Sequence, residues 1–165
     1  MILKKIEAAL NKQMNQELHA GYAYLSMSAY FDSLNLDGFA HWMRLQAQEE
    51  LEHSMKLFDY IISREGTVEL LAVKAPPKTW SSPLAAVQDG LKAERLNTKQ
   101  INDVFEAAAT AKDHATRVFL QWFVNEQVEE EATASKLVDK VKQIKDDNAA
   151  MFILDRELGA RTLVG

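Results

Sequence analysis

The sequence predicts an all-α fold: a four-helix bundle with a long crossover between its second and third helices and a short fifth helix at the C-terminal end. Three observations lead to this prediction. Apolar residues recur at helical spacing in four long segments and one short one, and no convincing alternating pattern typical of a strand is found. Six glycines and three prolines are few for 165 residues, and all three prolines lie between Pro76 and Pro83. The expected helices span residues 4–34, 38–65, 83–111, 114–145 and about 148–158.

The connections between these segments set the expected order of the helices. Short turns at residues 35–38 and 112–113 should make the first and second helices, and the third and fourth, antiparallel neighbours. The stretch 66–83 could extend to about 60 Å at about 3.3 Å per residue, whereas a helix of about 27 residues is only about 40 Å long. This stretch can therefore return along the bundle and leave the second and third helices parallel. Residues 82–83, serine then proline, are typical of an N-cap and first turn, and we expect one domain over residues 1–165.

The composition excludes several classes of site and partner. No cysteine is present, which excludes disulfide frameworks, thiolate zinc sites, iron–sulfur clusters and cysteine nucleophiles. With 19 basic and 24 acidic residues the net charge is −5, which disfavours nucleic acid or an anionic membrane as the main partner and favours cations. The N-terminus lacks the apolar run of a signal peptide, and no later run approaches the roughly 18 apolar residues of a membrane span. We therefore expect a cytoplasmic protein.

Polar residues interrupt the apolar stripe of every long helix. When each segment is projected at about 100° per residue, a glutamate falls on or near the stripe in all four. Glu50 and His53 are three residues apart and hence neighbours on one face. The polar residues on the four stripes are Glu17 and Tyr24, then Glu50 and His53, then Glu94, then Gln127 and Glu130. Each long helix therefore carries a candidate buried acid.

Four glutamates in one apolar interior predict a bound cation. A buried carboxylate must shift its pKa or find a partner, and no lysine or arginine lies on the stripes within two turns of these glutamates. Oxygen ligands with one imidazole suit iron, manganese or zinc. The alternatives are that single glutamates only solvate the rim of the bundle, that residues 126–131 form a solvated acidic face, and that Tyr24 is an ordinary core tyrosine. The agreement of four helices favours a metal site.

These residues resemble the ferritin-like di-iron carboxylate proteins, in which two helices each supply one glutamate and the other two each supply Glu-x-x-His. One Glu-x-x-His is present at residues 50–53, whereas the fourth helix has Gln127 and Glu130 where symmetric members have glutamate and histidine. This asymmetry is similar to true ferritins. The single glutamates are Glu17 and Glu94. Further stretches resemble bacterial non-haem ferritins: residues 15–18, 24–25, 39–40, 47–50, 119–123 and 126–131.

The resemblance implies which residues hold iron. The ligands of the first iron would be Glu17, Glu50 and His53. Those of the second would be Glu50, Glu94 and Glu130, with Glu50 bridging and Gln127 as a hydrogen-bonding or weak ligand. A third iron position, on the side of the di-iron centre that faces the hollow interior of a ferritin shell, would use Glu49, Glu126 and Glu129, with Glu130 shared. Tyr24 and Trp122 match aromatic residues beside the centre, and haem is not expected because Glu52 stands where haem-binding relatives have a methionine ligand.

The resemblance also implies a function. The expected protein is a hollow shell of 24 subunits that oxidises Fe(II) with dioxygen or hydrogen peroxide and stores a ferric oxyhydroxide mineral. A second interpretation is a di-iron oxidase or peroxidase on the same bundle without mineral storage, although the missing cysteines argue against a rubrerythrin. A third is a metal-free helical scaffold, which the four carboxylates disfavour. Mini-ferritins, which hold iron between subunits, are disfavoured by the complete ligand set within this chain.

Overall fold

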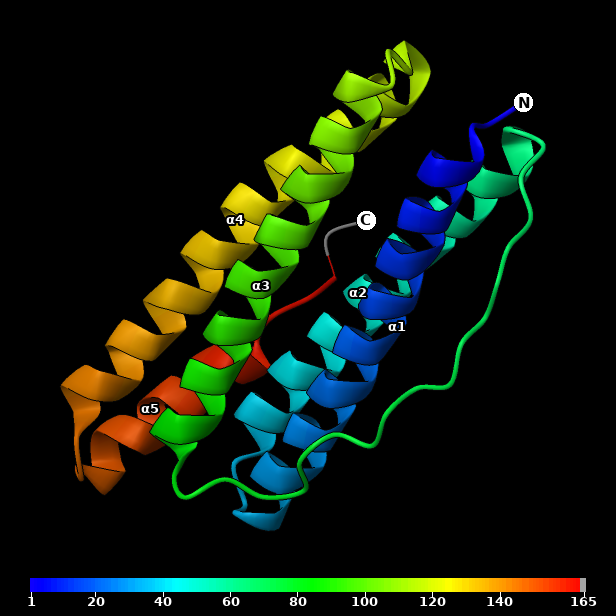
Figure 1. Ribbon diagram of the computed structural model, residues 1–165. Helices are drawn as coiled ribbons and strands as arrows, with labels where there is room; N and C mark the ends of the chain where they lie inside the picture. The colour runs from blue at the N-terminus through cyan, green and yellow to red at the C-terminus, as the bar shows by residue number, and fades with distance from the viewer. Residues whose placement is uncertain (164–165) are drawn as a thin grey trace.

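The computed structural model describes residues 1–163, which form five α-helices and no strand (Figure 1). The helices are α1 (Lys4–Ser33), α2 (Asp37–Ser63), α3 (Pro83–Thr110), α4 (His114–Ile144) and α5 (Asn148–Gly159). Each begins and ends close to its predicted bounds, so the all-α prediction is confirmed. Residues 164–165 of the predicted domain lie outside the described residues, and the single domain stays a prediction. None of the helices within residues 1–163 is both long and apolar enough to cross a membrane.

The four long helices form two antiparallel pairs. α1 packs against α2, α3 packs against α4, and α1 also packs against α3. The crossover, residues 64–82, runs back along the bundle, so α2 and α3 point the same way as predicted (Figure 1). Asn11 of α1 donates to the Thr67 carbonyl at 2.9 Å and accepts from the Glu69 amide at 2.7 Å, and Asn15 donates to the Glu69 carbonyl at 2.7 Å. These side chains hold the crossover against α1, although the crossover itself forms neither helix nor strand.

Local signals set the ends of the helices. The Ser82 hydroxyl accepts from the Ala85 amide at 3.1 Å and Pro83 begins α3, which confirms the predicted N-cap. Asp113 caps α4 in the same way by accepting from the Thr116 amide at 3.1 Å. Residues with positive φ follow the long helices and turn the chain: Asn35, Glu65, Lys112 and Lys145.

A layer of buried polar side chains, called the polar layer below, divides the apolar core into two clusters. One cluster lies at the α5 end and includes Phe31 and Phe39, and the other lies at the opposite end and includes Leu57 and Phe123. A fully buried side chain of this kind contributes about 1.5–3 kcal/mol. The two clusters therefore hold the helices together, and the predicted metal ligands lie between them on every long helix.

α5 lies against the start of α2 through a close backbone contact. The Phe39 amide donates to Asp155 Oδ1 at 2.9 Å. A Cβ atom on Gly38 would lie only 1.6 Å from the Asp155 carbonyl oxygen, so a side chain has no room there. Gly159 is less constrained, because its Cβ would lie 3.4 Å from the Gly38 Cα.

We expect Gly38→Ala to displace α5 and to lower the free energy of unfolding by about 1–3 kcal/mol, the usual cost of forced overpacking. Gly159→Ala is the matched control and should change it by less than about 0.5 kcal/mol. Urea unfolding followed by circular dichroism measures both. Equal stability of the two variants would show that α5 does not depend on this contact.

Candidate metal centre

The polar layer brings together six side chains that the sequence analysis predicted as ligands or near-ligands. All six are buried, and even the most exposed of them, Glu130, is only 6% accessible. They are Glu17 on α1, Glu50 and His53 on α2, Glu94 on α3, and Gln127 and Glu130 on α4. The helical projection therefore placed each of them on the correct face.

Glu17, Glu50 and His53 form one tight group. Each offers a ligand atom, and these atoms lie within 4.8 Å of one another. Because Glu50 and His53 occupy successive turns of α2, Glu50 Oε2 and His53 Nδ1 lie 3.4 Å apart. Ligand atoms bound at about 2.1 Å from one ion are about 3–4 Å from each other. Small side-chain movements would therefore bring these three residues onto a single metal ion.

Both carboxylate oxygens of Glu50 are buried, and neither has a hydrogen-bond partner among residues 1–163. A carboxylate buried without a donor costs several kcal/mol, because the charge loses its water and gains nothing in return. Most buried polar atoms in folded proteins do have a partner. A cation bound between the carboxylates of this layer would supply the partner that Glu50 lacks.

Two buried amides hold Glu17. Gln13 Nε2 donates to Glu17 Oε1 at 2.8 Å, and Asn97 Nδ2 donates to Glu17 Oε2 at 3.1 Å. Gln13 Nε2 also donates to Asn97 Oδ1 at 2.6 Å, which links α1 to α3. The two amides thus orient the Glu17 carboxylate.

Neutral donors also orient Glu94 and Glu130. The Tyr24 hydroxyl donates to Glu94 Oε1, and Gln127 Nε2 lies 3.3 Å from Glu94 Oε2. Gln46, which is buried on α2, donates to Glu130 Oε2 at 3.0 Å. Because none of these donors carries a charge, the carboxylates are positioned but the negative charge of the layer is not neutralised.

Burial raises the pKa of every glutamate in the layer. The pKa of Glu50 lies well above its usual value, because the charges of Glu17 and then Glu94 add to the effect of burial. Burial, reinforced by the charge of Glu94, raises the pKa of Glu130 to about 8. Burial lowers the pKa of His53 to about 4, so its imidazole is neutral and able to bind a metal at pH 7.

A cavity of about 500 Å³ opens between α2 and α4 beside this layer. His53, Glu126 and Glu130 each offer a ligand atom to it, and these atoms lie within 4.8 Å of one another. Trp122 lines the cavity and packs edge-on against His53, with ring centroids 5.3 Å apart. Burial and the charges of neighbouring acids raise the pKa of Glu126. The acids predicted for a third iron position all line this cavity: Glu49, Glu126 and Glu129.

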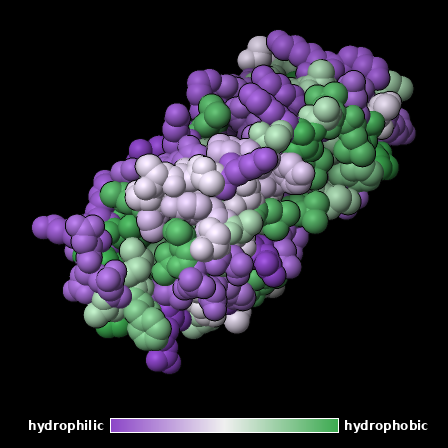
Figure 2. All heavy atoms as spheres, turned by 90° about the horizontal axis from the view of Figure 1, so that it is seen from below, coloured by the Kyte–Doolittle hydropathy of each residue, from purple (hydrophilic) through white to green (hydrophobic). Residues whose placement is uncertain are grey.

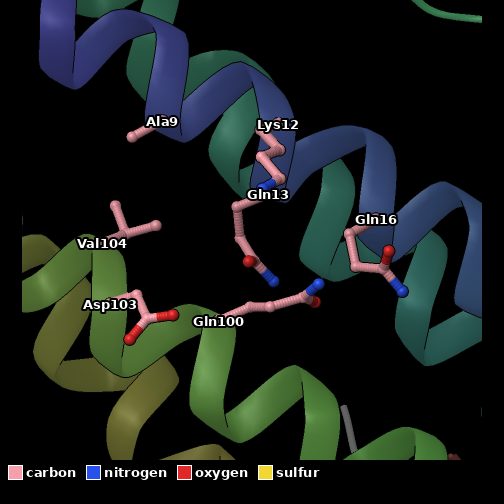
Figure 3. A pocket seen from close by; sticks show the side chains of 7 residues that line it. All are labelled: Ala9, Lys12, Gln13, Gln16, Gln100, Asp103 and Val104. Carbon is pink, nitrogen blue, oxygen red and sulfur yellow. The ribbon is translucent and has the colours of Figure 1, made fainter.

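A smaller cavity of about 150 Å³ lies between α1 and α3 (Figure 3). Gln13 and Gln100 extend toward one another across it. Gln13 is one of the two residues that donate to Glu17, so this cavity is one hydrogen bond away from the polar layer. Asp103 is the one carboxylate among the described residues that line it. The small cavity therefore offers no cluster of metal ligands.

Comparison with known proteins identifies the family. Residues 7–144 match the model of the ferritin family, described as a ferritin-like domain. This chain belongs to the ferritin family. It is 42% identical to a bacterial non-heme ferritin of Bacteroides fragilis over 161 residues, and this aligned region covers 98% of this chain and 100% of the relative. It is 43% identical over 162 residues to a bacterial non-heme ferritin of Staphylococcus epidermidis, with 98% of each chain covered.

Solved structures lead to the same family. An open pore ferritin from Archaeoglobus fulgidus matches this ferritin with a TM-score of 0.97 and 49% identity, over 98% of this chain and 100% of that one. A structure described as a humanized archaeal ferritin matches with a TM-score of 0.99 and 47% identity, over 100% of both chains. The predicted bundle with a short fifth helix is thereby confirmed. Family membership supports iron storage and iron binding.

Sequence reasoning missed four side chains around the centre of this ferritin. Three are amides that lie three or four residues from a ligand on the same helix, namely Gln13, Gln46 and Asn97. That spacing was visible in the sequence and could have indicated them. The fourth, Arg161, follows α5 and reaches the large cavity from a distant part of the chain, so no local signal marks it. The metal-binding roles themselves stay predictions.

The raised pKa values predict an unusual pH dependence for the metal-free ferritin. Glu130 ionises near pH 4.5 when unfolded and near pH 8 when folded, so stability is present at low pH and is lost as pH rises toward 8. His53 contributes to the pH dependence of stability only below about pH 6.5, where its imidazole takes up a proton in the unfolded chain but not in the folded chain. Between pH 6.5 and 8 the carboxylates alone act, and stability should fall by up to about 1.4 kcal/mol per pH unit per group.

Thermal unfolding of metal-free protein at pH 6.5 and pH 8 measures this slope. Glu130→Gln should reduce it, whereas the matched control Glu106→Gln, on an exposed face of α3, should leave it unchanged. A melting temperature that does not fall toward pH 8, or an unaltered slope in Glu130→Gln, would contradict the assignment.

Proposed function

We propose that this ferritin oxidises Fe(II) at a di-iron centre in the polar layer and stores the ferric product as a mineral inside a shell of 24 subunits. The observation that carries the proposal is Glu50, whose two buried oxygens have no partner among the described residues and lie amid other carboxylates. Two ions, one on each side, would satisfy both oxygens. Family membership indicates that the metal is iron, since ferritins store iron.

The groups in the polar layer support one assignment of ligand roles. Ligands of the first iron are Glu17, Glu50 and His53, which already form one group. Ligands of the second iron are Glu50, Glu94 and Glu130, with Glu50 as the bridge and Gln127 as a weak ligand or hydrogen-bond donor. Tyr24 donates to Glu94 and so positions a ligand of the second iron. The neutral His53 imidazole needs no deprotonation before it binds.

The chemistry fits oxidation followed by release. Each Fe(II) loses one electron, and dioxygen takes up two electrons and two protons to become hydrogen peroxide, which can in turn oxidise two further Fe(II). Carboxylates switch between one- and two-oxygen coordination, so the site can follow iron from Fe(II) to Fe(III). Oxygen ligands with one imidazole hold the product less permanently than a thiolate set would hold a softer ion.

In this proposal iron leaves the di-iron centre through the large cavity. A third iron binds in this cavity between α2 and α4, beside the di-iron centre, and the aromatic ring of Trp122 lines the cavity beside His53. Its ligands are Glu49, Glu126 and Glu129, with Glu130 shared. Like-charged acids at this spacing repel one another unless a cation lies among them, which favours the site when iron is present.

The exposed apolar surface supports assembly. Leu70 and Leu71 of the crossover are 67% and 54% exposed, and Phe152 and Ile153 of α5 are 62% and 68% exposed. Figure 2 shows apolar groups at the surface of one face of the molecule. A shell of identical subunits would cover such groups. The proposal includes a cytoplasmic location and no haem, with neither nucleic acid nor membrane as partner.

The second candidate, a di-iron oxidase or peroxidase without mineral storage, would use the same centre. Particle mass together with aerobic Fe(II) oxidation separates the two. We expect a particle of about 24 subunits that oxidises many more Fe(II) ions than its centres can hold and retains them in a dense core. A particle of one or two subunits, or oxidation that stops once the centres are full, would favour the second candidate.

We expect Glu50→Ala and His53→Ala to slow rapid Fe(II) oxidation at least about 100-fold in stopped-flow measurements, because each removes a ligand from the first iron. Metal-free stability should hold or rise in Glu50→Ala, since the partnerless carboxylate is removed, although the small void left behind offsets part of this gain. Glu106→Ala is the control for loss of an exposed helical glutamate. Oxidation at the unmodified rate in Glu50→Ala would refute the ligand assignment.

A further inference from the structure

Arg161 places a fixed positive charge in the large acidic cavity. Its Nη2 donates to Glu49 Oε2 at 2.8 Å and to Gln46 Oε1 at 2.5 Å. The guanidinium lies over the Trp42 ring, 4.5 Å from its centroid. The side chains of Arg161 and Glu49 are 21% and 17% exposed, so the ion pair is largely removed from solvent. Such a pair is stronger than one on an open surface.

The main chain fixes Arg161 in this position as well. The His41 Nε2 donates to the Arg161 carbonyl at 2.8 Å, and Arg161 Nη1 reaches the Trp42 carbonyl at 3.4 Å. The segment that follows α5 is therefore fastened to α2 by both its backbone and its side chain. The guanidinium reaches the cavity because of these contacts.

The contacts of Arg161 extend toward the di-iron centre through one buried amide. Gln46 accepts from Arg161 with its oxygen and donates to Glu130 Oε2 with its nitrogen at 3.0 Å. Gln46 is only 1% exposed, and these two contacts fix which way its amide points. One guanidinium thus pairs directly with Glu49 and, through Gln46, positions a carboxylate of the polar layer.

We propose that Arg161 is an internal competitor for the metal ion at the third position: it pairs with Oε2 of Glu49 in the metal-free protein and competes with a cation for this carboxylate. The inference rests on the proposed third iron position, which shares Glu49. A positive charge that stays within reach of a ligand weakens cation binding by repulsion and by competition for the same oxygen. The third ion is therefore held loosely and passes on toward the interior of the shell.

A purely structural role for Arg161, as a fastener of the segment after α5, makes a different prediction. In that case Arg161→Ala would lower stability and would leave the metal affinity of the acids unchanged or lower it, because Gln46 would no longer be held against Glu130. Competition instead predicts a higher metal affinity in Arg161→Ala, because removal of the guanidinium frees Glu49. A rise in metal affinity at the Glu49 position is thus a readout that a structural role would not produce.

Zn(II), which does not change oxidation state, is the probe. The assembled protein is equilibrated with buffered free Zn(II), and crystals give the anomalous occupancy at each position. We expect half-saturation beside Glu49 at about tenfold lower free Zn(II) in Arg161→Ala than in the unmodified protein. Arg156→Ala, which removes an equal charge from an exposed position on α5, should leave it unchanged. Arg161→Lys keeps the charge and should differ by less than about threefold.

A double-mutant cycle isolates the pair. In a Glu49→Gln background, Arg161→Ala should alter half-saturation at this position by less than about twofold, because the competition for Glu49 is gone and only the weaker repulsion remains. Equal half-saturation in Arg161→Ala and the unmodified protein, or no zinc beside Glu49 in either, overturns the inference. Occupancy among Glu17, Glu50 and His53 is recorded in the same crystals, and zinc missing there would instead overturn the proposed di-iron centre.

Discussion

The cost of removing carboxylates from water is the constraint on which the structure depends. Four glutamates lie in one layer of the bundle, and the donors that touch them are amides and one phenol, which carry no charge. The polar layer can therefore be neutralised by protons or by metal ions, and these two compete. The apolar clusters on either side would maintain the fold while metal ions replaced protons in this layer.

Much of this arrangement could be predicted from the sequence, because it depends on local periodicity. The five helices, the Ser82 cap and the return of the crossover all follow from spacing within single segments. The inward direction of the glutamates follows from the same periodicity. What sequence could not supply was the set of contacts between segments: Asn97 bonded to Glu17 from another helix, and Arg161 bonded to Glu49 across more than 100 residues. No periodic pattern encodes these.

The amides show why a site contains more than its ligands. Gln13 and Gln46 each lie one helical turn before a predicted ligand, yet each serves a carboxylate by a hydrogen bond rather than by binding metal. A carboxylate free to rotate would lose side-chain entropy when an ion bound, and the amides impose that loss during folding instead. The charge remains for the ion to neutralise.

The long crossover has a consequence for the order of folding events. α1 with α2, and α3 with α4, are hairpins joined by short turns, so each pair forms through contacts that are local along the chain. Docking of one hairpin on the other closes a longer loop and dehydrates the glutamates of both at once. The slow step should therefore be this docking, which places the kinetic barrier at the same surface where the two halves of the ligand set meet.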